Sequence, residues 1–225
     1  MTILKNLSDL FYPRLCLSCG ESLIEGEKFI CTNCLADFPM SNNAYQSEDK
    51  LLCKFEKELN LQKIYSLFYY NKYSKYRELI RAIKYHSNGE LAFYLGKMLG
   101  QYICKECYVD ALVPIPLHPR KEKERGFNQS LKIAKGISEV LNIPILDKLI
   151  FRNKYTISQT GLSTEERLRN VENAFSIKNR AQARGLHILV VDDVITTGAT
   201  IHACVKQISQ IENTKFSISC LARAY

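Results

Sequence analysis

The sequence predicts an α/β fold, in which a mainly parallel sheet is flanked by helices, preceded by a small module that contains four cysteines. Apolar strand-like segments alternate with amphipathic helical segments over most of the chain. The run LHILVVDD at 186–193 is almost continuously apolar, as expected for a strand at the buried centre of a parallel sheet. A length of 225 residues allows one full domain and one small appendage.

The order of the elements follows from hydrophobic spacing and from the positions of proline. Helical spacing predicts helices within 73–86, 90–103, 128–142 and 198–213. Strand-like composition predicts strands within 63–73, 110–120, 145–150, 186–193 and 215–222. Three prolines in the second strand segment exclude a helix there and predict a strand that runs out into a loop. The polar segment 152–170 predicts a long loop.

Net charge and hydropathy limit which partners and which cellular location are expected. The formal net charge of +8 and the pI near 9.0 favour polyanionic partners such as phosphates, nucleic acid or an acidic membrane face. Lys5 and Asp9 interrupt the apolar residues at the start of the chain, so we expect no secretory signal. The apolar runs are too short for a spanning helix. We therefore expect a cytoplasmic protein that is not an integral membrane protein, with the inner face of the membrane as a more specific location.

Four of the nine cysteines lie close together as Cys16, Cys19, Cys31 and Cys34, in the pattern C-x2-C-x11-C-x2-C. Two residues between paired thiols let both sulfurs reach one tetrahedral ion, and Gly20 permits the tight turn that follows the first pair. This pattern predicts a structural zinc site, since four thiolates leave no open position for a substrate. Four reduced thiols in a small core are the alternative. No functional site is assigned to Cys53, Cys104, Cys107, Cys204 or Cys220.

The strongest functional motif is VVDDVITTGAT, from Val190 to Thr200. A buried strand ends in two acids, and a loop with one glycine then enters a helix. Unpaired N–H groups of such a loop and the helix dipole bind a phosphate without any basic side chain. We therefore expect a phosphate to be bound by Thr196, Thr197, Gly198, Ala199 and Thr200.

The two acids of this motif predict a second function for the strand end. Asp192 and Asp193 are placed to bind ribose hydroxyls, directly or through hydrated magnesium. The motif lacks the Gly-Lys-Ser/Thr of a Walker loop and the G-x-G-x-x-G of a dinucleotide site. The alternative is an ordinary polar turn, with Asp193 near a helix cap.

This combination resembles the signature with which type I phosphoribosyltransferases bind phosphoribosyl pyrophosphate (PRPP). The resemblance implies that Asp192 and Asp193 hold the ribose, that residues 196–200 hold its 5-phosphate, and that magnesium accompanies PRPP. It also implies a type I phosphoribosyltransferase fold. The sequence shows no catalytic base and no acceptor pocket, so the fold and the ligand loop do not by themselves establish a transfer reaction.

Three further segments resemble the ComF family of bacterial competence and DNA-uptake proteins. They are VPIPLHPRKEKERGFNQS at 113–130, IKYHSNGELA at 83–92, and the pattern T-x-x-Q-T-x-L-S-x-x-x-R-x-x-N at 156–170. With the four-cysteine module they cover nearly the whole chain. The resemblance implies a zinc-binding module at 1–45, a linker at 46–62 and a phosphoribosyltransferase-like domain at 63–225.

The resemblance also assigns candidate residues outside the phosphate loop. Candidates for the pyrophosphate end are Lys84, His118, Arg120 and Arg167, of which Arg167 lies in a segment expected to close over the substrate. Candidates for single-stranded DNA are Lys121, Lys123 and Arg125, for which a solvated basic loop is the alternative.

We therefore expect a ComF-like protein that binds PRPP and single-stranded DNA and acts in DNA uptake, with a competence helicase or membrane channel component as a possible partner. One alternative is an active phosphoribosyltransferase of nucleobase or amine metabolism. Another is a scaffold whose zinc module docks a helicase or membrane partner.

Overall fold

The computed structural model describes residues 13–41, 61–153 and 174–224. Its centre is a four-stranded parallel sheet, in the order β1-β6-β5-β2. The bounds of these strands are Leu61–Tyr70 for β1, Ala111–Pro114 for β2, His187–Ile195 for β5 and Lys215–Ala224 for β6. The α/β class and the parallel sheet predicted from the sequence are confirmed.

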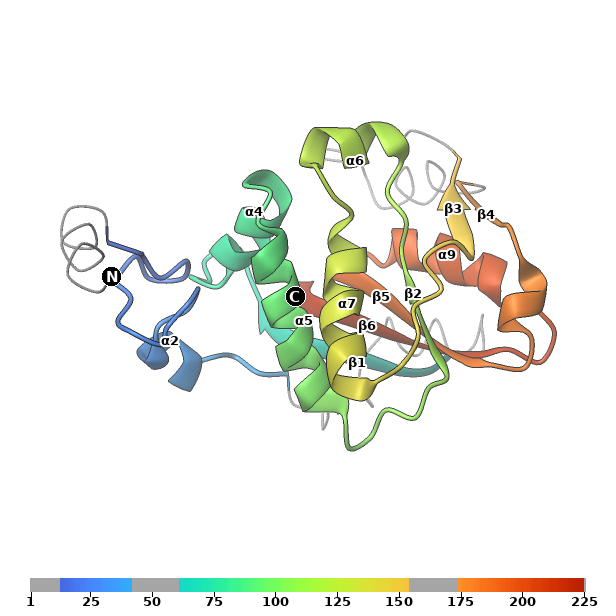
Figure 1. The fold of residues 1–225 in the computed structure, drawn as a ribbon, viewed down its shortest axis with the longest axis horizontal. Coiled ribbons are helices and arrows are strands. Elements are labelled where there is room, and N and C mark those ends of the chain that lie inside the picture. Colours follow the sequence, from blue (N-terminus) through green and yellow to red (C-terminus); the bar gives the residue numbers. More distant parts are fainter. Residues whose placement is uncertain (1–12, 42–60, 154–173, 225) are drawn as a thin grey trace, which may run out of the picture.

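Helices cover both faces of the sheet (Figure 1). One face carries α4 (Arg77–Tyr85), α5 (Gly89–Ile103) and α7 (Gln129–Leu141). The other face carries α9 (Ala199–Ile208), the antiparallel pair of β3 (Ile150–Arg152) and β4 (Phe175–Ile177), and the short helix η2 (Arg180–Ala183). Each face has its own hydrophobic core.

Strand β5 joins the two cores. Leu189 and Val191 belong to the core under α5 and α7, whereas Ile188 and Val190 belong to the core under α9. All four side chains are fully buried. A strand that is covered on both faces needs apolar residues at every position, because successive side chains point to opposite faces. This explains why the sequence of β5 reads as a continuous apolar run.

Helices α5 and α7 pack through two glycines. A Cβ at Gly136 would overlap the carbonyl oxygen of Phe93 and lie 2.7 Å from the backbone nitrogen of Lys97. A Cβ at Gly96 would similarly overlap the carbonyl oxygen of Ile133. The two backbones therefore touch where neither helix has a side chain, and this close contact fixes where the first turn of α7 lies over the sheet.

The N-terminal module covers the edge of the sheet at β1. The backbone N–H of Ser41 donates to Leu67 O at 2.9 Å, and the N–H of Tyr69 donates to Pro39 O at 3.3 Å. The Phe38 ring packs edge-on against Phe68, with ring centroids 5.0 Å apart. An uncovered edge strand exposes unpaired backbone groups to other chains, so this contact protects β1.

Two segments differ from their sequence-based expectation. Residues Pro119–Arg125 form a helix, α6, where we expected a loop. Pro119 occupies the first turn of α6, the one helical position that tolerates a residue without an N–H, and Gly126 ends the helix at φ 80°. Of the strand expected at 145–150, only Ile150 belongs to β3, while Ile145 makes a single bridge to Leu112.

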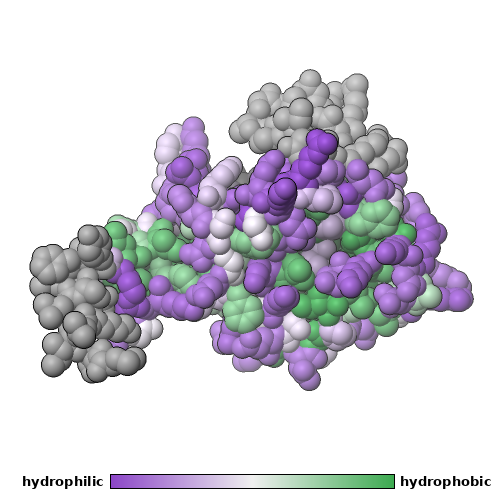
Figure 2. All heavy atoms as spheres, turned by 45° about the horizontal axis from the view of Figure 1, so that its top comes forward, coloured by the Kyte–Doolittle hydropathy of each residue, from purple (hydrophilic) through white to green (hydrophobic). Residues whose placement is uncertain are grey.

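The surface is mainly polar. Figure 2 shows hydrophilic side chains over most of one face, with hydrophobic areas confined to patches. Within residues 13–41, 61–153 and 174–224, every helix is too short or too polar to span a bilayer.

The Gly136 contact yields a stability prediction. Gly136→Ala should lower the free energy of unfolding, because overlap with the backbone of α5 outweighs the gain in helix propensity, which is at most about 1 kcal/mol. Denaturant unfolding monitored by circular dichroism measures the change. Gly100→Ala is the matched control, since its nearest neighbour is a side-chain atom of Val140 at 3.0 Å. Equal effects of the two substitutions would contradict the packing argument.

Candidate functional site

The candidate site lies at the carboxyl ends of the parallel strands, where β5 passes into α9. Asp192 and Asp193 are in the last part of β5, residues 196–198 form the turn, and Ala199 begins the helix. Open parallel sheets bind ligands at this edge. The structure thus places the two predicted ribose residues and the five predicted phosphate residues on one continuous segment, from the end of β5 through the turn to the first residues of α9.

Gly198 gives the turn its shape. Its φ of 72° lies in the left-handed region, which residues other than glycine rarely adopt. Gly198 caps α9 without a side-chain hydrogen bond, so the first N–H groups of the helix remain available at its amino end. Thr196 is exposed and Thr200 is partly exposed. The turn therefore offers backbone and hydroxyl donors to an anion, as the sequence predicts.

Asp192 is the most constrained charged residue of the site. Its Oδ1 accepts hydrogen bonds from Ser130 Oγ at 3.0 Å and from the N–H of Asp193 at 2.9 Å. Burial, followed by repulsion from the Asp193 carboxylate, raises the pKa of Asp192 to about 7, although these hydrogen bonds and Lys84 act in the opposite direction. Two adjacent acids in a poorly solvated position favour the binding of a cation or a hydroxyl donor.

Lys84 supplies part of the compensating charge. Its Nζ lies 3.3 Å from Asp193 Oδ2, and the two side chains are 26% and 13% exposed. Burial alone would lower the pKa of Lys84, but the charges of Asp193 and Asp192 outweigh it and raise the pKa. The structure thus brings Lys84, from the last turn of α4, to the acidic pair.

Two capping side chains shape the segment between β2 and α7. His118 caps α6, and its Nδ1 accepts a hydrogen bond from the N–H of Arg120 at 3.2 Å. Asn128 is buried, caps α7, and donates from Nδ2 to Ile115 O at 3.1 Å. This bond holds the end of β2 against the start of α7.

Lys121 lies close enough to Arg152, Arg125 and Lys84 for their charges to act on it. Burial, followed by the positive charges of Arg152 and Arg125, lowers the pKa of Lys121. Burial also lowers the pKa of Arg152, while the charge of Asp192 acts in the opposite direction. Lys123, by contrast, is exposed on the outer side of α6. Lys121 and Arg125 therefore belong to the surroundings of the site, and Lys123 belongs to the outer surface.

Sequence reasoning missed two residues of the site and placed one outside the described residues. Ser130 and Arg152 contact or influence Asp192, yet neither was among the predicted site residues. Ser130 is the last residue of the segment 113–130 that resembles the ComF family and lies in the first turn of α7, and these two features could have pointed to it, whereas Arg152 belongs to no quoted motif. Arg167 and the pattern at 156–170 lie in the segment 154–173, outside the described residues.

The four cysteines of the N-terminal module form one cluster. The four sulfur atoms all lie within 4.8 Å of one another, and Cys19 Sγ and Cys31 Sγ are 3.7 Å apart. A tetrahedral zinc with Zn–S bonds of about 2.3 Å requires sulfur separations of about 3.8 Å. Gly20 follows the first pair at φ 81°, as its predicted role in a tight turn requires. The donor set and its geometry are therefore compatible with zinc.

The remaining described cysteines form no such cluster. Cys104 is exposed, whereas Cys107, Cys204 and Cys220 are buried, and burial raises the pKa of Cys107 to about 11. Burial also raises the pKa of Cys204 and of Cys220, so the three buried thiols stay protonated near neutral pH. Cys53 lies outside the described residues.

Several curated proteins are similar to this chain, although no family model matches it. "Competence protein F" of Haemophilus influenzae is 36% identical over 118 residues, which are 51% of this chain and 51% of that protein. "DNA utilization protein YhgH" of Salmonella typhi is 30% identical over 151 residues, 64% of this chain and 66% of that protein. "Competence protein ComFC" of Bacillus subtilis is 32% identical over 193 residues, 84% of this chain and 75% of that protein. The chain thus spans between half and three quarters of the length of these relatives.

The raised pKa of Asp192 predicts a dependence of stability on pH. Because the folded pKa of about 7 exceeds the ordinary value of 3.8, the folded state binds more protons than the unfolded state between these values. Asp192 should therefore destabilise the ligand-free protein increasingly as the pH rises from about 4 to 7.

Asp192→Asn keeps the accepting oxygen and removes the charge. We expect its melting temperature to exceed that of the unchanged protein at pH 8, by about 2–4 °C per kcal/mol, and the gain to shrink towards pH 4. Thermal unfolding at pH 4, 6 and 8 measures this trend. Glu139→Gln, at an exposed ion pair with Lys97, is the control. A gain that does not depend on pH would refute the assignment.

Proposed function

Because the chain belongs to the ComF family of competence proteins, we propose that it binds PRPP with magnesium and single-stranded DNA, and that it acts in DNA uptake. The acidic pair and the turn into α9 carry this proposal. One structural element provides both carboxylates for ribose and magnesium and N–H donors for a 5-phosphate.

The charge distribution supports the orientation of PRPP in the proposed site. The 5-phosphate would lie at the amino end of α9, and the ribose would lie over Asp192 and Asp193. The pyrophosphate would then extend towards the end of β2, where Lys121, Arg125 and Arg152 gather. The charges of Arg152 and Arg125 help to lower the pKa of Lys121, and a bound anion would relieve this repulsion, so the group suits a pyrophosphate.

Magnesium fits the same arrangement. Asp192 and Asp193 are hard oxygen ligands, and their mutual repulsion, with Lys84 as the cation that pairs with Asp193, leaves room for a further positive charge. Magnesium bound with PRPP would neutralise pyrophosphate charge. Because the sequence offers no catalytic base, binding alone is the core of the proposal.

DNA binding is proposed for the outer side of α6. Lys123 is exposed and available to phosphates, whereas Lys121 and Arg125 are only partly exposed and face the cations of the site. DNA phosphates would therefore contact Lys123 first, with Lys121 and Arg125 close to both ligands. The net charge of +8 favours this association at low salt.

We further infer that the four-cysteine cluster holds a structural zinc. All four ligand positions are supplied by the protein, so no position remains for a substrate. Tyr76 in turn donates to Cys34 O at 2.9 Å, which ties the cluster to the start of α4. Zinc would thereby stabilise the module that covers the edge of β1.

Calorimetric titration with PRPP and magnesium, with and without a single-stranded oligonucleotide, tests the proposed function. The unchanged protein should bind both ligands. Changing Asp192 and Asp193 together to Asn should weaken PRPP binding at least 100-fold and leave zinc content and the circular dichroism spectrum unchanged. Glu212→Gln, at an exposed ion pair with Arg184, should have no effect. Unchanged PRPP affinity of the double variant would exclude the site.

Metal analysis tests the zinc inference. We expect one zinc per chain, and Cys16→Ser should lose the zinc and lower the melting temperature, because the module then no longer holds its fold over β1. Cys104→Ser is the matched control, since this thiol is exposed and outside the cluster. Full zinc content in the Cys16→Ser variant would contradict the inference.

A further inference from the structure

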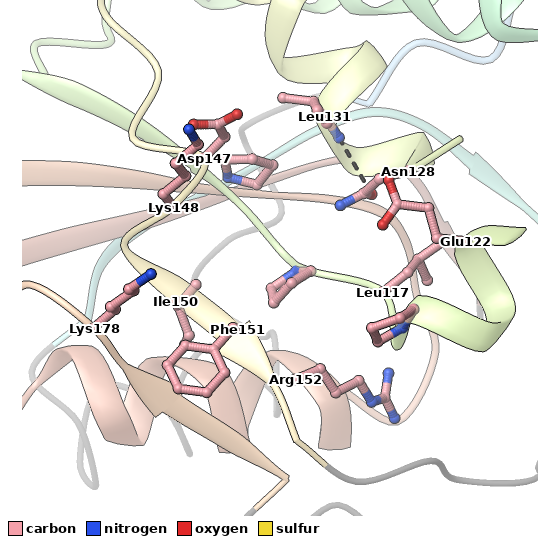
Figure 3. Close-up of a pocket in the computed structure, with 13 residues that line it drawn as sticks. Leu117, Glu122, Asn128, Leu131, Asp147, Lys148, Ile150, Phe151, Arg152 and Lys178 are labelled. Carbon is pink, nitrogen blue, oxygen red and sulfur yellow. Dashed lines mark hydrogen bonds between the residues drawn. The ribbon is translucent and has the colours of Figure 1, made fainter. Parts of the chain in front are cut away.

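A cavity of about 550 Å³ opens beside the candidate site, and of its lining residues only Arg152 has a role in the functions proposed above. Its walls come from the segment after β2, from the starts of α6 and α7, and from β3 (Figure 3). Arg152 lines the cavity and is also close enough to Asp192 for that charge to act on its pKa. The cavity therefore adjoins the acidic pair, although neither Asp192 nor Asp193 lines it.

The interior of the cavity is largely apolar. Pro114, Pro116 and Leu117 line it from the end of β2, and Leu131 and Ile150 add aliphatic surface. Its volume lies in the range of about 300–1,000 Å³ that is typical of sites for small organic groups. Water gains little from contact with such a surface, so an apolar, compact group is the favoured occupant.

An exposed aromatic side chain, Phe151, lines this cavity. Phe151 is 42% exposed although it belongs to a strand, and its neighbours in the chain, Ile150 and Arg152, are buried and partly buried. A large apolar side chain that remains in contact with water, beside a hollow, offers a face on which another flat ring can stack.

Positive charge borders the same opening. Lys148 precedes β3 and Lys178 follows β4, and Figure 3 shows the two side chains on the same side of the cavity. Neither lysine forms an ion pair within the described residues. Arg152 adds a third cation. With the two carboxylates of Glu122 and Asp147, the lining carries a net charge of about +1 at neutral pH.

These features together describe a group with a flat apolar body, hydrogen-bonding edges and an attached negative charge. A nucleobase that carries its phosphates has all three. Its ring can stack on Phe151, its N–H groups can donate to Glu122 or Asp147, and its phosphates can contact Lys148 and Lys178. A base within a duplex is already stacked and paired, so the base must come from a single strand.

We propose that this cavity receives a base of single-stranded DNA, with Phe151 as the stacking residue and Lys148 and Lys178 as phosphate contacts. The inference rests on the proposed DNA-binding function and adds the place where the strand is held. Leu117 and Pro119, which flank the pyrophosphate candidate His118, form part of the cavity wall. A base in the cavity therefore contacts the residues on either side of His118, which gives the two ligands a direct physical connection.

Fluorescence anisotropy of an end-labelled thymidine oligonucleotide tests the proposal on the full chain. Phe151→Ala should weaken binding about tenfold, which is the usual effect of losing one stacked base, whereas Phe151→Trp should preserve the affinity. Changing Lys148 and Lys178 together to Ala should reduce the slope of log Kd against log salt by about 1.4, since each single-strand phosphate contact contributes about 0.7.

Lys105 and Tyr108 provide the matched control. They are an exposed lysine and an exposed tyrosine in the loop that leads into the amino end of β2, whereas the cavity lies at the carboxyl end of that strand. Changing both to Ala should leave the affinity and the salt dependence unchanged. Circular dichroism should show unchanged folding for all variants, and Phe151→Trp together with the double lysine variant keeps the test decisive even where Phe151→Ala folds poorly.

A photo-cross-link locates the base. An oligonucleotide with 4-thiothymidine should cross-link to the peptide that contains Phe151, and cross-links found only elsewhere overturn the proposal. Displacement of the oligonucleotide by dTMP with equal affinity would show a free-nucleotide site and also overturn it. Tight binding by the unchanged protein with no effect of Phe151→Ala removes the cavity proposal alone. No binding by the unchanged protein removes the DNA function as well.

Discussion

The structure depends on the charge balance at the carboxyl end of β5, where two adjacent carboxylates are held in a poorly solvated position. Repulsion between Asp192 and Asp193 is tolerated because Lys84 pairs with one and Ser130 donates to the other. These partners come from α4 and α7, two helices on the same face of the sheet. The helices must therefore lie close to their observed positions for the acids to be accommodated at all.

The packing beneath the site serves this requirement. Gly96 and Gly136 let α5 and α7 approach until their backbones touch, and this places the first turn of α7, with Ser130, over the end of β5. Asn128 anchors the same turn to the end of β2. At the far edge of the sheet, the N-terminal module pairs with β1 and shares its aromatic core. A metal in that module would stabilise the sheet from its edge.

The site has two electrostatic halves. The turn into α9 presents backbone N–H groups and threonine hydroxyls, whereas α6 and β3 present cationic side chains. The acidic pair separates them. A ligand with phosphate at each end and hydroxyls between matches this sequence of donors and acceptors. Arg152 belongs to the cationic half and also lines the largely apolar cavity. Recognition of the sugar phosphate and recognition of a base would therefore both involve β3.

Much of this arrangement can be predicted from short segments of the sequence. The continuous apolar run before Asp192, the single glycine in the turn, and the paired cysteines each reflect a constraint that acts within a few residues, so the sequence predicts the central strand, the phosphate turn and the metal cluster. Lys84 was predicted as a site residue through resemblance, but its pairing with Asp193 was not. Helix α6 was expected as a loop, because Pro114, Pro116 and Pro119 together argue against a helix. Pro119 is nevertheless compatible with one, since it lies in the first turn, where its missing N–H has no partner in the helix.

The sequence by itself therefore determined the α/β class, the acidic strand end and the four-cysteine cluster, because each rests on neighbours in the chain. Only the tertiary structure decided that Ser130 and Arg152 act on Asp192, that Lys121 faces the site while Lys123 faces solvent, and that Phe151 stands in a cavity. These relations join residues that lie far apart in the chain. Their distances and their burial arise only when the helices close over the two faces of the sheet.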